Sequence, residues 1–522
     1  MRNRSHSFQL ALAIKLMCAA AAIGAAGHAT AAPDITRVIV AFKPGSAAAI
    51  RSAVGAAHGA IQHEIYGMDA MAIEVPTQAL NGLSRNPNVL YVEEDVKRYP
   101  LGGTTASTGN PYLMGQLVPW GIKAVQADQL ADTSAGNREV CIIDSGYDRS
   151  HEDLSANAVT GEYDRGTGWW YTDENHHGTH VAGTIAAVNN NDVGVVGVNP
   201  NRNLKLHIVK VFGADGWAYS SSLATAANKC GAASANVISM SLGGGRPSKT
   251  EERAFNTLAG KGVLSVAAAG NDGNTAVSYP AGYASVMSVA AVDESLNVAS
   301  FSQFNSKVEL AGPGVNVLST VPMGGGASPS LVVGTTTYAP GAMDGSPKTS
   351  ATGALADFGI GDKVVTGSMT GQVCLIARGT IDFATKVGNC QKSGGKGAVV
   401  YNNAAGGFSG TLGTTVTTIP SVTASDTEGA ALKGQLGVSA TVAVNATNYA
   451  YYDGTSMATP HVSAVAALVW SYFPTCTGAQ IRASLGKSAK DLNAAGRDVY
   501  TGFGLVQAKA AHDRIASLGC GN

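Results

Sequence analysis

The octet Gly-Thr-Ser-Met-Ala-Thr-Pro-His, from Gly454 to His461, is the feature that most constrains what this chain can fold into. Ser456 lies between a strand-like run, Tyr449 to Tyr452, and a helix-like run, Val462 to Trp470. A serine at a helix N-terminus faces oriented backbone amides, and Pro460 is expected in the first helical turn, where its missing N–H costs nothing. Because a serine hydroxyl becomes a good nucleophile only when a base takes its proton, the octet predicts a histidine and a carboxylate elsewhere in the chain.

Candidates for both partners precede the serine. Asp144 ends the apolar run Val140 to Ile143 and is followed by Ser-Gly, which predicts a buried parallel strand that stops at a turn. His177 precedes a stretch of small apolar residues that is typical of a helix start. Taken alone, Asp144 is more simply a turn-capping residue, and His177 with His180 could belong to a metal site. Neither alternative explains the octet.

The three runs, Val140 to Gly146, His177 to Gly183 and the octet, occur in the order Asp, His, Ser and resemble the subtilisin-like serine peptidases, or subtilases. This resemblance implies an α/β fold in which helices sandwich a mainly parallel sheet. The expected peptidase core has two parts, 112–322 and 448–522. Strand-like and helix-like runs alternate along the first part, as such a sheet requires.

The resemblance also implies a role for each residue of the site. Ser456 is expected to attack the scissile carbonyl, His177 to carry the proton and Asp144 to orient the imidazole. The run Ala267 to Asn271 resembles the subtilase oxyanion segment. Asn271 is therefore expected to donate its side-chain amide to the developing oxyanion, beside the backbone N–H of Ser456.

Two runs are expected to frame the substrate. Ser241, Leu242 and Gly243 match the family strand whose backbone pairs with an extended peptide. Ala268 and Gly270 are expected in the other wall of the first pocket. Because neither run carries a charge, we expect a preference for large apolar or aromatic residues before the cleaved bond.

A structural calcium site is implied by a second resemblance to the family. Asp153 matches a family calcium ligand, and the loop from Val188 to Val195 matches the loop that supplies the others. Carboxylate, amide and backbone oxygens suit Ca²⁺. The expected ligands are Asp153, Val188, Asn190, Val193 and Val195, and an ordinary solvated loop is the alternative.

Residues 34 to about 100 carry no catalytic motif. Basic residues followed by an apolar run and small residues predict a secretory signal peptide over residues 1–32, and hence an extracellular protein. Residues 33–101 resemble the inhibitor-type propeptide of subtilases, a small α+β unit that would assist folding and then block the cleft as an intramolecular inhibitor. Self-cleavage is expected between Tyr99 and Asn110.

Between the two parts of the core lie residues that the simplest subtilase plan does not need. Residues 325–447 are rich in Gly, Thr and Val and, around Cys374 and Val399, resemble a protease-associated (PA) domain, which is β-rich. Such a domain could gate the substrate or be a passive spacer, and the sequence does not separate the two.

The chain has seven cysteines, of which Cys18 lies in the predicted signal peptide. Six in an exported chain predict three disulfides with 15 formal connectivities, and buried free thiols are the alternative. Position along the chain favours three pairs, the first of them as in proteinase-K-like subtilases: Cys141 with Cys230, Cys374 with Cys390, and Cys476 with Cys520.

The net charge of −1 implies no nucleic-acid partner, and no later run is apolar enough to anchor the chain in a membrane. We expect a monomer that acts on polypeptides. Two other functions remain in view, a catalytically silent binding protein on the same scaffold and a broad esterase.

Overall fold

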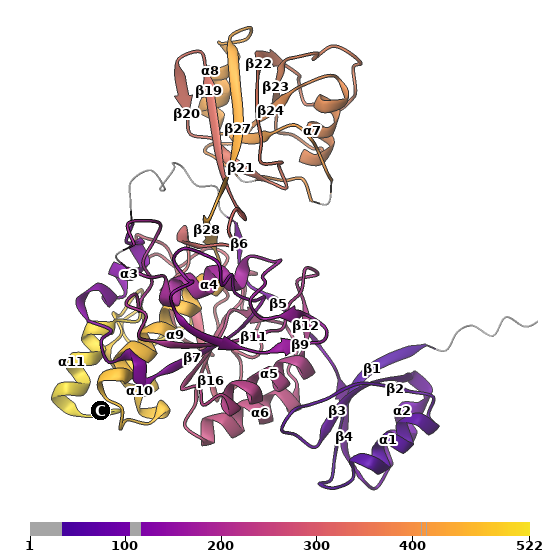
Figure 1. Cartoon of the computed structure of the whole chain (residues 1–522), viewed down its shortest axis with the longest axis vertical. Coiled ribbons are helices and arrows are strands. Elements are labelled where there is room, and N and C mark those ends of the chain that lie inside the picture. The colour runs from indigo at the N-terminus through magenta and orange to yellow at the C-terminus, as the bar shows by residue number, and fades with distance from the viewer. Residues whose placement is uncertain (1–33, 105–115, 190, 409, 414) are drawn as a thin grey trace, which may run out of the picture.

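The structure is a computed structural model that describes residues 34–104, 116–189, 191–408, 410–413 and 415–522. The predicted signal peptide therefore lies outside the described residues. The chain folds into a central α/β core, an N-terminal unit beside it and a β-rich unit that projects from it (Figure 1).

A seven-stranded sheet forms the centre of the core, and all its neighbouring strands are parallel. Its strands are largely continuous buried runs, as expected when both faces of a sheet are covered. In spatial order they are β17 (Val308–Pro313), β16 (Val286–Val292), β15 (Leu264–Ala268), β13 (Val237–Met240), β7 (Glu139–Asp144), β11 (Lys205–Lys210) and β8 (Ala158–Gly161).

Helices cover both faces of this sheet, which confirms the predicted fold class. The largest core cluster joins one face to helices α4 (His177–Ala186), α9 (Thr455–Tyr472), α10 (Gly478–Ser488) and α11 (Ala508–Leu518). A second cluster joins the other face to α5 (Ser220–Ala232) and α6 (Lys249–Gly260). The short α3 (Trp120–Ala124) lies at the edge of the core.

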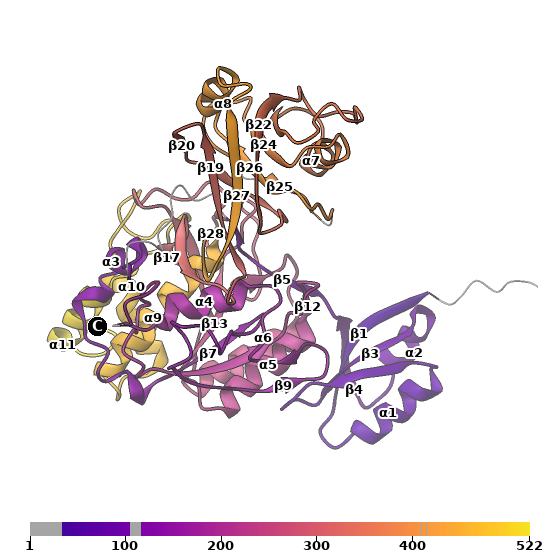
Figure 2. The same ribbon diagram turned by 45° about the horizontal axis from the view of Figure 1, so that its top comes forward.

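The N-terminal unit is a four-stranded antiparallel sheet in the order β2-β3-β1-β4, with helices packed on one side. It lies on the side of the core that carries α5 and α6 (Figure 2). Its elements are β1 (Ile35–Phe42), α1 (Ala47–Ala56), β2 (Ala60–Glu64), β3 (Ala70–Pro76), α2 (Leu80–Ser84) and β4 (Val89–Glu94).

The projecting unit contains a nine-stranded mixed sheet in the order β20-β19-β27-β22-β23-β24-β26-β21-β25. Its first and last strands, β19 (Gly326–Val333) and β27 (Ser439–Thr447), pair antiparallel along their length, so the insertion leaves and re-enters the core at one place. The other elements are β20 (Thr336–Tyr338), β21 (Gly341–Asp344), β22 (Ser350–Asp357), β23 (Val373–Ala377), α7 (Phe383–Lys392), β24 (Gly397–Tyr401), β25 (Gly410–Thr411), β26 (Ser421–Ala424) and α8 (Asp426–Lys433).

Three disulfides close the described chain, and all three predicted pairs are confirmed: Cys141–Cys230, Cys374–Cys390 and Cys476–Cys520. The first joins β7 to α5, the second lies within the projecting unit, and the third ties the segment before α10 to the C-terminus.

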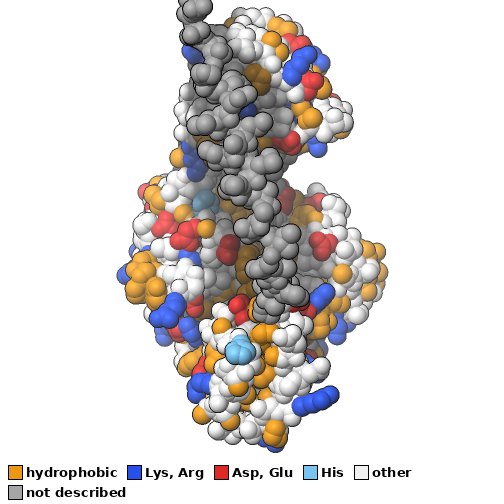
Figure 3. Space-filling model, turned by 90° about the vertical axis from the view of Figure 1, so that its right-hand side faces the viewer, with side chains coloured by type: hydrophobic (Ala, Val, Ile, Leu, Met, Phe, Trp, Pro, Cys, Tyr) orange, Lys and Arg blue, Asp and Glu red, His pale blue; other side chains and the backbone are white. Residues whose placement is uncertain are grey.

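Lys and Arg side chains are interspersed with Asp and Glu on the face shown in Figure 3, and neither sign gathers into one patch there. No helix in the described ranges is both long enough and apolar enough to cross a membrane.

Candidate active site

Asp144 and His177 meet at the carboxyl edge of the central sheet. Asp144 is the last residue of β7, and His177 is the first residue of α4. The imidazole Nδ1 lies 2.8 Å from Asp144 Oδ1, which also accepts the backbone N–H of Ser145 at 2.8 Å. This contact assigns the proton to Nδ1 and leaves Nε2 as a lone-pair acceptor.

Two opposing effects set the basicity of His177. Burial of the ring lowers its pKa, but the charge of Asp144 and the hydrogen bond to it outweigh burial, so the pKa lies above its usual value. His180 differs although it is only one turn away. Burial lowers the pKa of His180 to about 3, and its Nε2 donates to the backbone oxygens of Val317 and Ala450. His180 is therefore a neutral, hydrogen-bonded core residue.

Ser456 lies in the first turn of α9, which begins at Thr455, so the serine lies at a helix N-terminus as the sequence predicts. The prediction for Pro460 was wrong, because this residue lies inside the helix, one turn after Ser456. The carbonyl oxygen of Ser456 thus loses the N–H that would normally reach it from four residues on. The Ser241 hydroxyl donates to that oxygen instead, at 2.7 Å.

The Ser456 hydroxyl donates to the backbone oxygen of Ser241 at 2.8 Å and not to His177. His177 Nε2 is buried without a hydrogen-bond partner in the described part of the chain. It faces Gly102, where an added Cβ would lie only 2.9 Å from Nε2. The chain itself therefore passes across the site.

The carbonyl oxygen of Leu101 occupies a two-donor cradle. It accepts Asn271 Nδ2 at 2.7 Å and the backbone N–H of Ser456 at 3.0 Å. Asn271 is fixed in turn, because its Oδ1 accepts both the amide and the hydroxyl of Thr455. Gly454 leaves room for this contact: its φ is 151°, and a Cβ there would lie 2.4 Å from the Leu101 oxygen.

The residues before Leu101 form a strand across the site. Strand β5 (Lys97–Pro100) is the centre of a three-stranded antiparallel sheet, between β12 (Ala218–Tyr219) and β14 (Leu242–Gly243). The Leu101 N–H continues the ladder to the Ser241 oxygen at 3.2 Å. After Gly102, β6 (Gly103–Thr104) pairs with β28 (Tyr449–Asp453), which also pairs with β18 (Val317–Thr320).

Gly243 borders the space taken by the Leu101 side chain. A Cβ at Gly243 would lie 2.9 Å from Leu101 Cδ1 and 2.2 Å from Ser278 Oγ. The other two predicted pocket residues have less direct positions. Ala268 is buried at the end of β15, and the Gly270 N–H donates to Thr455, so neither hydrogen-bonds the 97–102 segment within the described residues.

The predicted calcium loop gathers oxygens around a residue that the sequence analysis missed. Gln116 Nε2 lies 2.7 Å from Val188 O, 2.9 Å from Asn191 Oδ1 and 3.3 Å from Val195 O. Asp153 adjoins this group, since its Oδ1 accepts Asn191 Nδ2 at 2.6 Å and its Oδ2 accepts the Val195 N–H at 2.8 Å. Burial raises the pKa of the Asp153 carboxyl.

Of the two further predicted calcium ligands, the described residues include one, Val193. Asn190 lies outside the described residues, and Asn191 provides the amide oxygen. Val193 contributes only an N–H directed at Asn191 Oδ1 at 3.5 Å. The sequence signal that could have found Asn191 is the run Asn189-Asn190-Asn191, in which the extra residue of the loop leaves the register open.

Two carboxylates of the N-terminal unit bind the starts of two core helices. Glu93 accepts the backbone N–H groups of Lys249 and Thr250 at the start of α6, at 2.8 and 2.9 Å. Asp95 accepts the backbone N–H and hydroxyl of Ser221 at the start of α5, at 3.0 and 2.7 Å. Negative charge at a helix N-terminus satisfies free N–H groups and complements the helix dipole.

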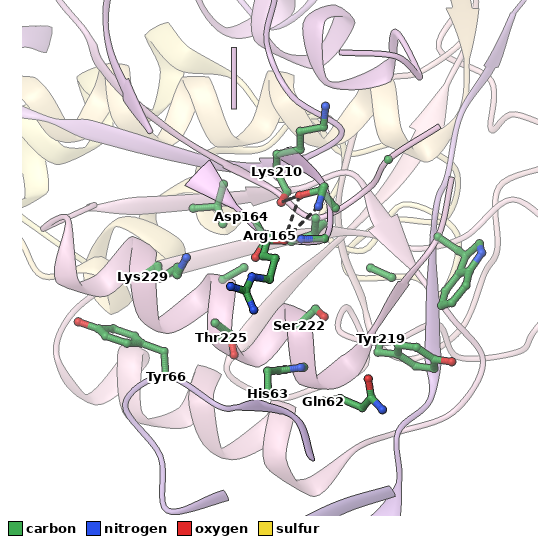
Figure 4. Close-up of a pocket in the computed structure, with 18 of the residues that line it drawn as sticks. Gln62, His63, Tyr66, Asp164, Arg165, Lys210, Tyr219, Ser222, Thr225 and Lys229 are labelled. Carbon is green, nitrogen blue, oxygen red and sulfur yellow. Dashed lines mark hydrogen bonds between the residues drawn. The ribbon is translucent and has the colours of Figure 1, made fainter. Parts of the chain in front are cut away.

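A hollow of about 570 Å³ lies next to this contact, between the N-terminal unit and the core (Figure 4). His63 of β2 borders it, and its Nε2 has no hydrogen-bond partner among the described residues. Burial lowers the pKa of His63. The nearby Asp95 and Asp164 oppose this shift, and Arg37 adds to it.

Comparisons with known proteins agree with this geometry. The family model described as "Subtilase family" matches residues 136–357 and 413–504, and the "PA domain" model matches 330–432. An alkaline protease of Alkalihalobacillus alcalophilus is 40% identical over 267 residues, which are 50% of this chain and 64% of that protein. The chain thus spans a little under two thirds of that relative.

Solved structures extend the likeness. The subtilisin-like protease Apa1 from the Antarctic psychrotroph Pseudoalteromonas sp. AS-11 is 46% identical, with a TM-score of 0.58, and the match covers 78% of this chain and all of that one. Fervidolysin from Fervidobacterium pennivorans shares the fold at 24% identity and a TM-score of 0.59, over 92% of this chain and 61% of that one. The PA-domain match lies ahead of Ser456 in the chain. The subtilase match and the Apa1 likeness together show that the chain belongs to the subtilase family.

Proposed function

We propose that this protein is a serine endopeptidase made as a zymogen, which cuts its own chain between Leu101 and Gly102. The observation that carries the proposal is the position of the Leu101 carbonyl, held by Asn271 and the Ser456 amide beside His177. These donors lie where an oxyanion hole must hold the carbonyl oxygen of a bond under attack.

The geometry supports a definite order of steps. The Ser456 hydroxyl exchanges its bond to the Ser241 oxygen for one to the free Nε2 of His177. His177 removes the hydroxyl proton as Ser456 attacks the Leu101 carbonyl carbon, and Asp144 stabilises the imidazolium through Nδ1. The proton then passes to the Gly102 nitrogen as the peptide bond breaks, and water hydrolyses the acyl-enzyme by the same route.

After the cut, residues 34–101 would remain as an inhibitor. Strand β5 already fills the groove between β12 and β14, while Glu93 and Asp95 hold the N-terminal unit to α6 and α5. Substrate polypeptides would take the place of β5 by strand addition, with main-chain bonds giving affinity and side-chain pockets giving selectivity. We propose that the enzyme acts outside the cell as a monomer.

Mass spectrometry of the secreted protein beside its Ser456→Ala form tests the proposal. The wild type should yield a fragment that begins at Gly102, and the variant should remain joined at this bond. A matched control is Ser463→Ala, which removes a buried hydroxyl from the same helix, one that donates only to Thr459 O. Cleavage in Ser456→Ala at the wild-type rate would refute the proposed nucleophile. Hydrolysis of small esters without hydrolysis of casein would favour the esterase instead.

We further propose that the loop around Asp153 holds a structural calcium ion. The donor set fits, because an amide oxygen and two carbonyl oxygens lie around the Gln116 amide, and the Asp153 carboxylate adjoins them through Asn191. The nitrogen and oxygen of a Gln amide are not distinguished by shape, so a flip of the Gln116 amide would add a fifth oxygen. The ion would fix surface loops without entering the chemistry. A melting temperature that neither a chelator lowers nor added Ca²⁺ raises would contradict this proposal.

A further inference from the structure

Arg98 is the fourth residue before the proposed cut, and it is the one long side chain of β5 that is buried in the core. It is 1% exposed, whereas Tyr99 next to it is 46% exposed. Alternate side chains of a strand face opposite sides, so a peptide in this groove directs its fourth residue to the same place. The core therefore has an enclosed site for that side chain.

Glu251 of α6 closes this site and is 0% exposed. Arg98 Nε lies 3.1 Å from Glu251 Oε2, and Arg98 Nη2 lies 3.0 Å from Oε2 and 3.1 Å from Oε1. Two further guanidinium N–H groups reach backbone oxygens: Nη2 donates to Arg246 O at 3.0 Å and Nη1 to Lys97 O at 3.1 Å. The planar guanidinium group of Arg98 thus finds hydrogen-bond acceptors along more than one of its edges.

The local structure of α6 frees Glu251 for this contact. Glu251 is the third residue of the helix after the cap Ser248, a position from which a glutamate commonly turns back to bind the N–H of the cap. Here the Ser248 N–H donates to the Tyr283 hydroxyl at 2.8 Å. The carboxylate consequently faces the groove and not its own helix.

A buried carboxylate needs a partner. Burial raises the pKa of Glu251, while the charge and hydrogen bonds of Arg98 lower it, so an unpaired negative charge is disfavoured in this environment. Arginine at the fourth position supplies the missing positive charge and the donors together. Alanine leaves the carboxylate with the neutral Tyr283 hydroxyl beside it and no positive charge, and glutamate adds a second negative charge.

We propose that Glu251 makes the enzyme selective for polypeptides with arginine at the fourth position before the cleaved bond, with its own Lys97-Arg98-Tyr99-Pro100-Leu101 sequence as one example. This selectivity rests on the proposed peptidase function and adds a second determinant to the apolar pocket at Gly243. The competing role for the Arg98–Glu251 pair is to attach the N-terminal segment without influence on other substrates.

The test uses the self-processed enzyme and quenched fluorescent peptides Val-Lys-X-Tyr-Pro-Leu-Gly-Gly, with X as Arg, Lys, Ala or Glu. We expect kcat/KM for X = Arg to exceed that for X = Ala by on the order of 30-fold, as for a buried charged pair that loses one partner. Lysine should rank between them, since a point charge cannot bind the carboxylate through two edges.

Two variants locate the effect. Glu251→Gln should reduce the ratio of kcat/KM between the Arg and Ala peptides to a few-fold. Glu252→Gln makes the same charge change on the adjacent residue, which makes no bond to Arg98, and should keep the wild-type ratio. Because the two kcat/KM values in each ratio are measured on the same enzyme, differences between variants in the fraction of folded protein cancel.

Equal cleavage of the Arg and Ala peptides by the wild type would overturn the inference and leave the peptidase function intact. A wild-type preference that Glu251→Gln retains would also overturn it. If no peptide in the set is cut, the peptidase proposal itself fails, and the selectivity fails with it.

Discussion

Replacing Asn271 by aspartate tests the proposed oxyanion site with little change of shape. Asn271 Nδ2 lies 2.7 Å from the Leu101 oxygen, while Oδ1 accepts two bonds from Thr455. Aspartate keeps an oxygen for Thr455 and substitutes an acceptor for the donor. The Ser456 N–H, 3.0 Å from the same oxygen, remains. Loss of one such donor costs about 10²–10³ in kcat, or about 2.7–4 kcal/mol of transition-state stabilisation.

The assay is steady-state hydrolysis of the Arg-containing peptide by the processed enzymes. We expect kcat of Asn271→Asp to fall by at least about 10² with a much smaller change in KM, because the donor acts on charge that develops during the attack. Asn274→Asp is the matched control, an exposed residue of the same loop whose Oδ1 accepts the Ala276 N–H and can do so as a carboxylate. A near-normal kcat in Asn271→Asp would refute the reasoning, as would an equal loss in Asn274→Asp.

Three other predictions follow from the site. Gly243→Leu should shift preference from Leu to Ala before the cut, because its Cβ would lie 2.9 Å from Leu101 Cδ1; relative kcat/KM values check this, and an unchanged ratio would contradict it. Because His177 must be neutral to act as base and Asp144 raises its pKa, activity should fall as the pH drops through that pKa. Asp144→Asn should move this acid limb to lower pH and reduce kcat by about 10⁴, and a pH–rate profile with an unmoved limb would argue against the pairing. Burial against the core lowers the pKa of His63, so His63 takes up a proton more readily when the N-terminal unit is released than when it is bound. Binding of the released unit to the core should therefore be strongest above about pH 6.5 and weaken as the pH falls. Inhibition by a unit that carries His63→Leu should depend less on pH.

The sequence alone determined the fold class and the residues that meet at the sheet edge. Apolar runs such as Val140 to Ile143, which ends at Asp144, mark buried parallel strands, because a strand covered on both faces has no polar side. The disulfide pairs were also predicted from the sequence. Cys374 and Cys390 lie in the insertion, Cys476 and Cys520 both follow the nucleophile, and the pair Cys141–Cys230 is the one that the family resemblance implies. Helix α9 was harder to predict: Pro460 suggested a start nearby, and the Ser241 hydroxyl that lets the helix continue through it comes from more than 200 residues away.

Only the tertiary structure decided how distant side chains pair. Nothing in the local sequence around Arg98 or Glu251 indicates that they form a buried ion pair, since they are 153 residues apart and each alone is typical of an exposed position. The same holds for Gln116 at the calcium loop and for the Leu101 oxygen beside Asn271. Periodicity along a chain records which residues avoid water, whereas the partner of a buried charge or carbonyl depends on which elements the fold brings together.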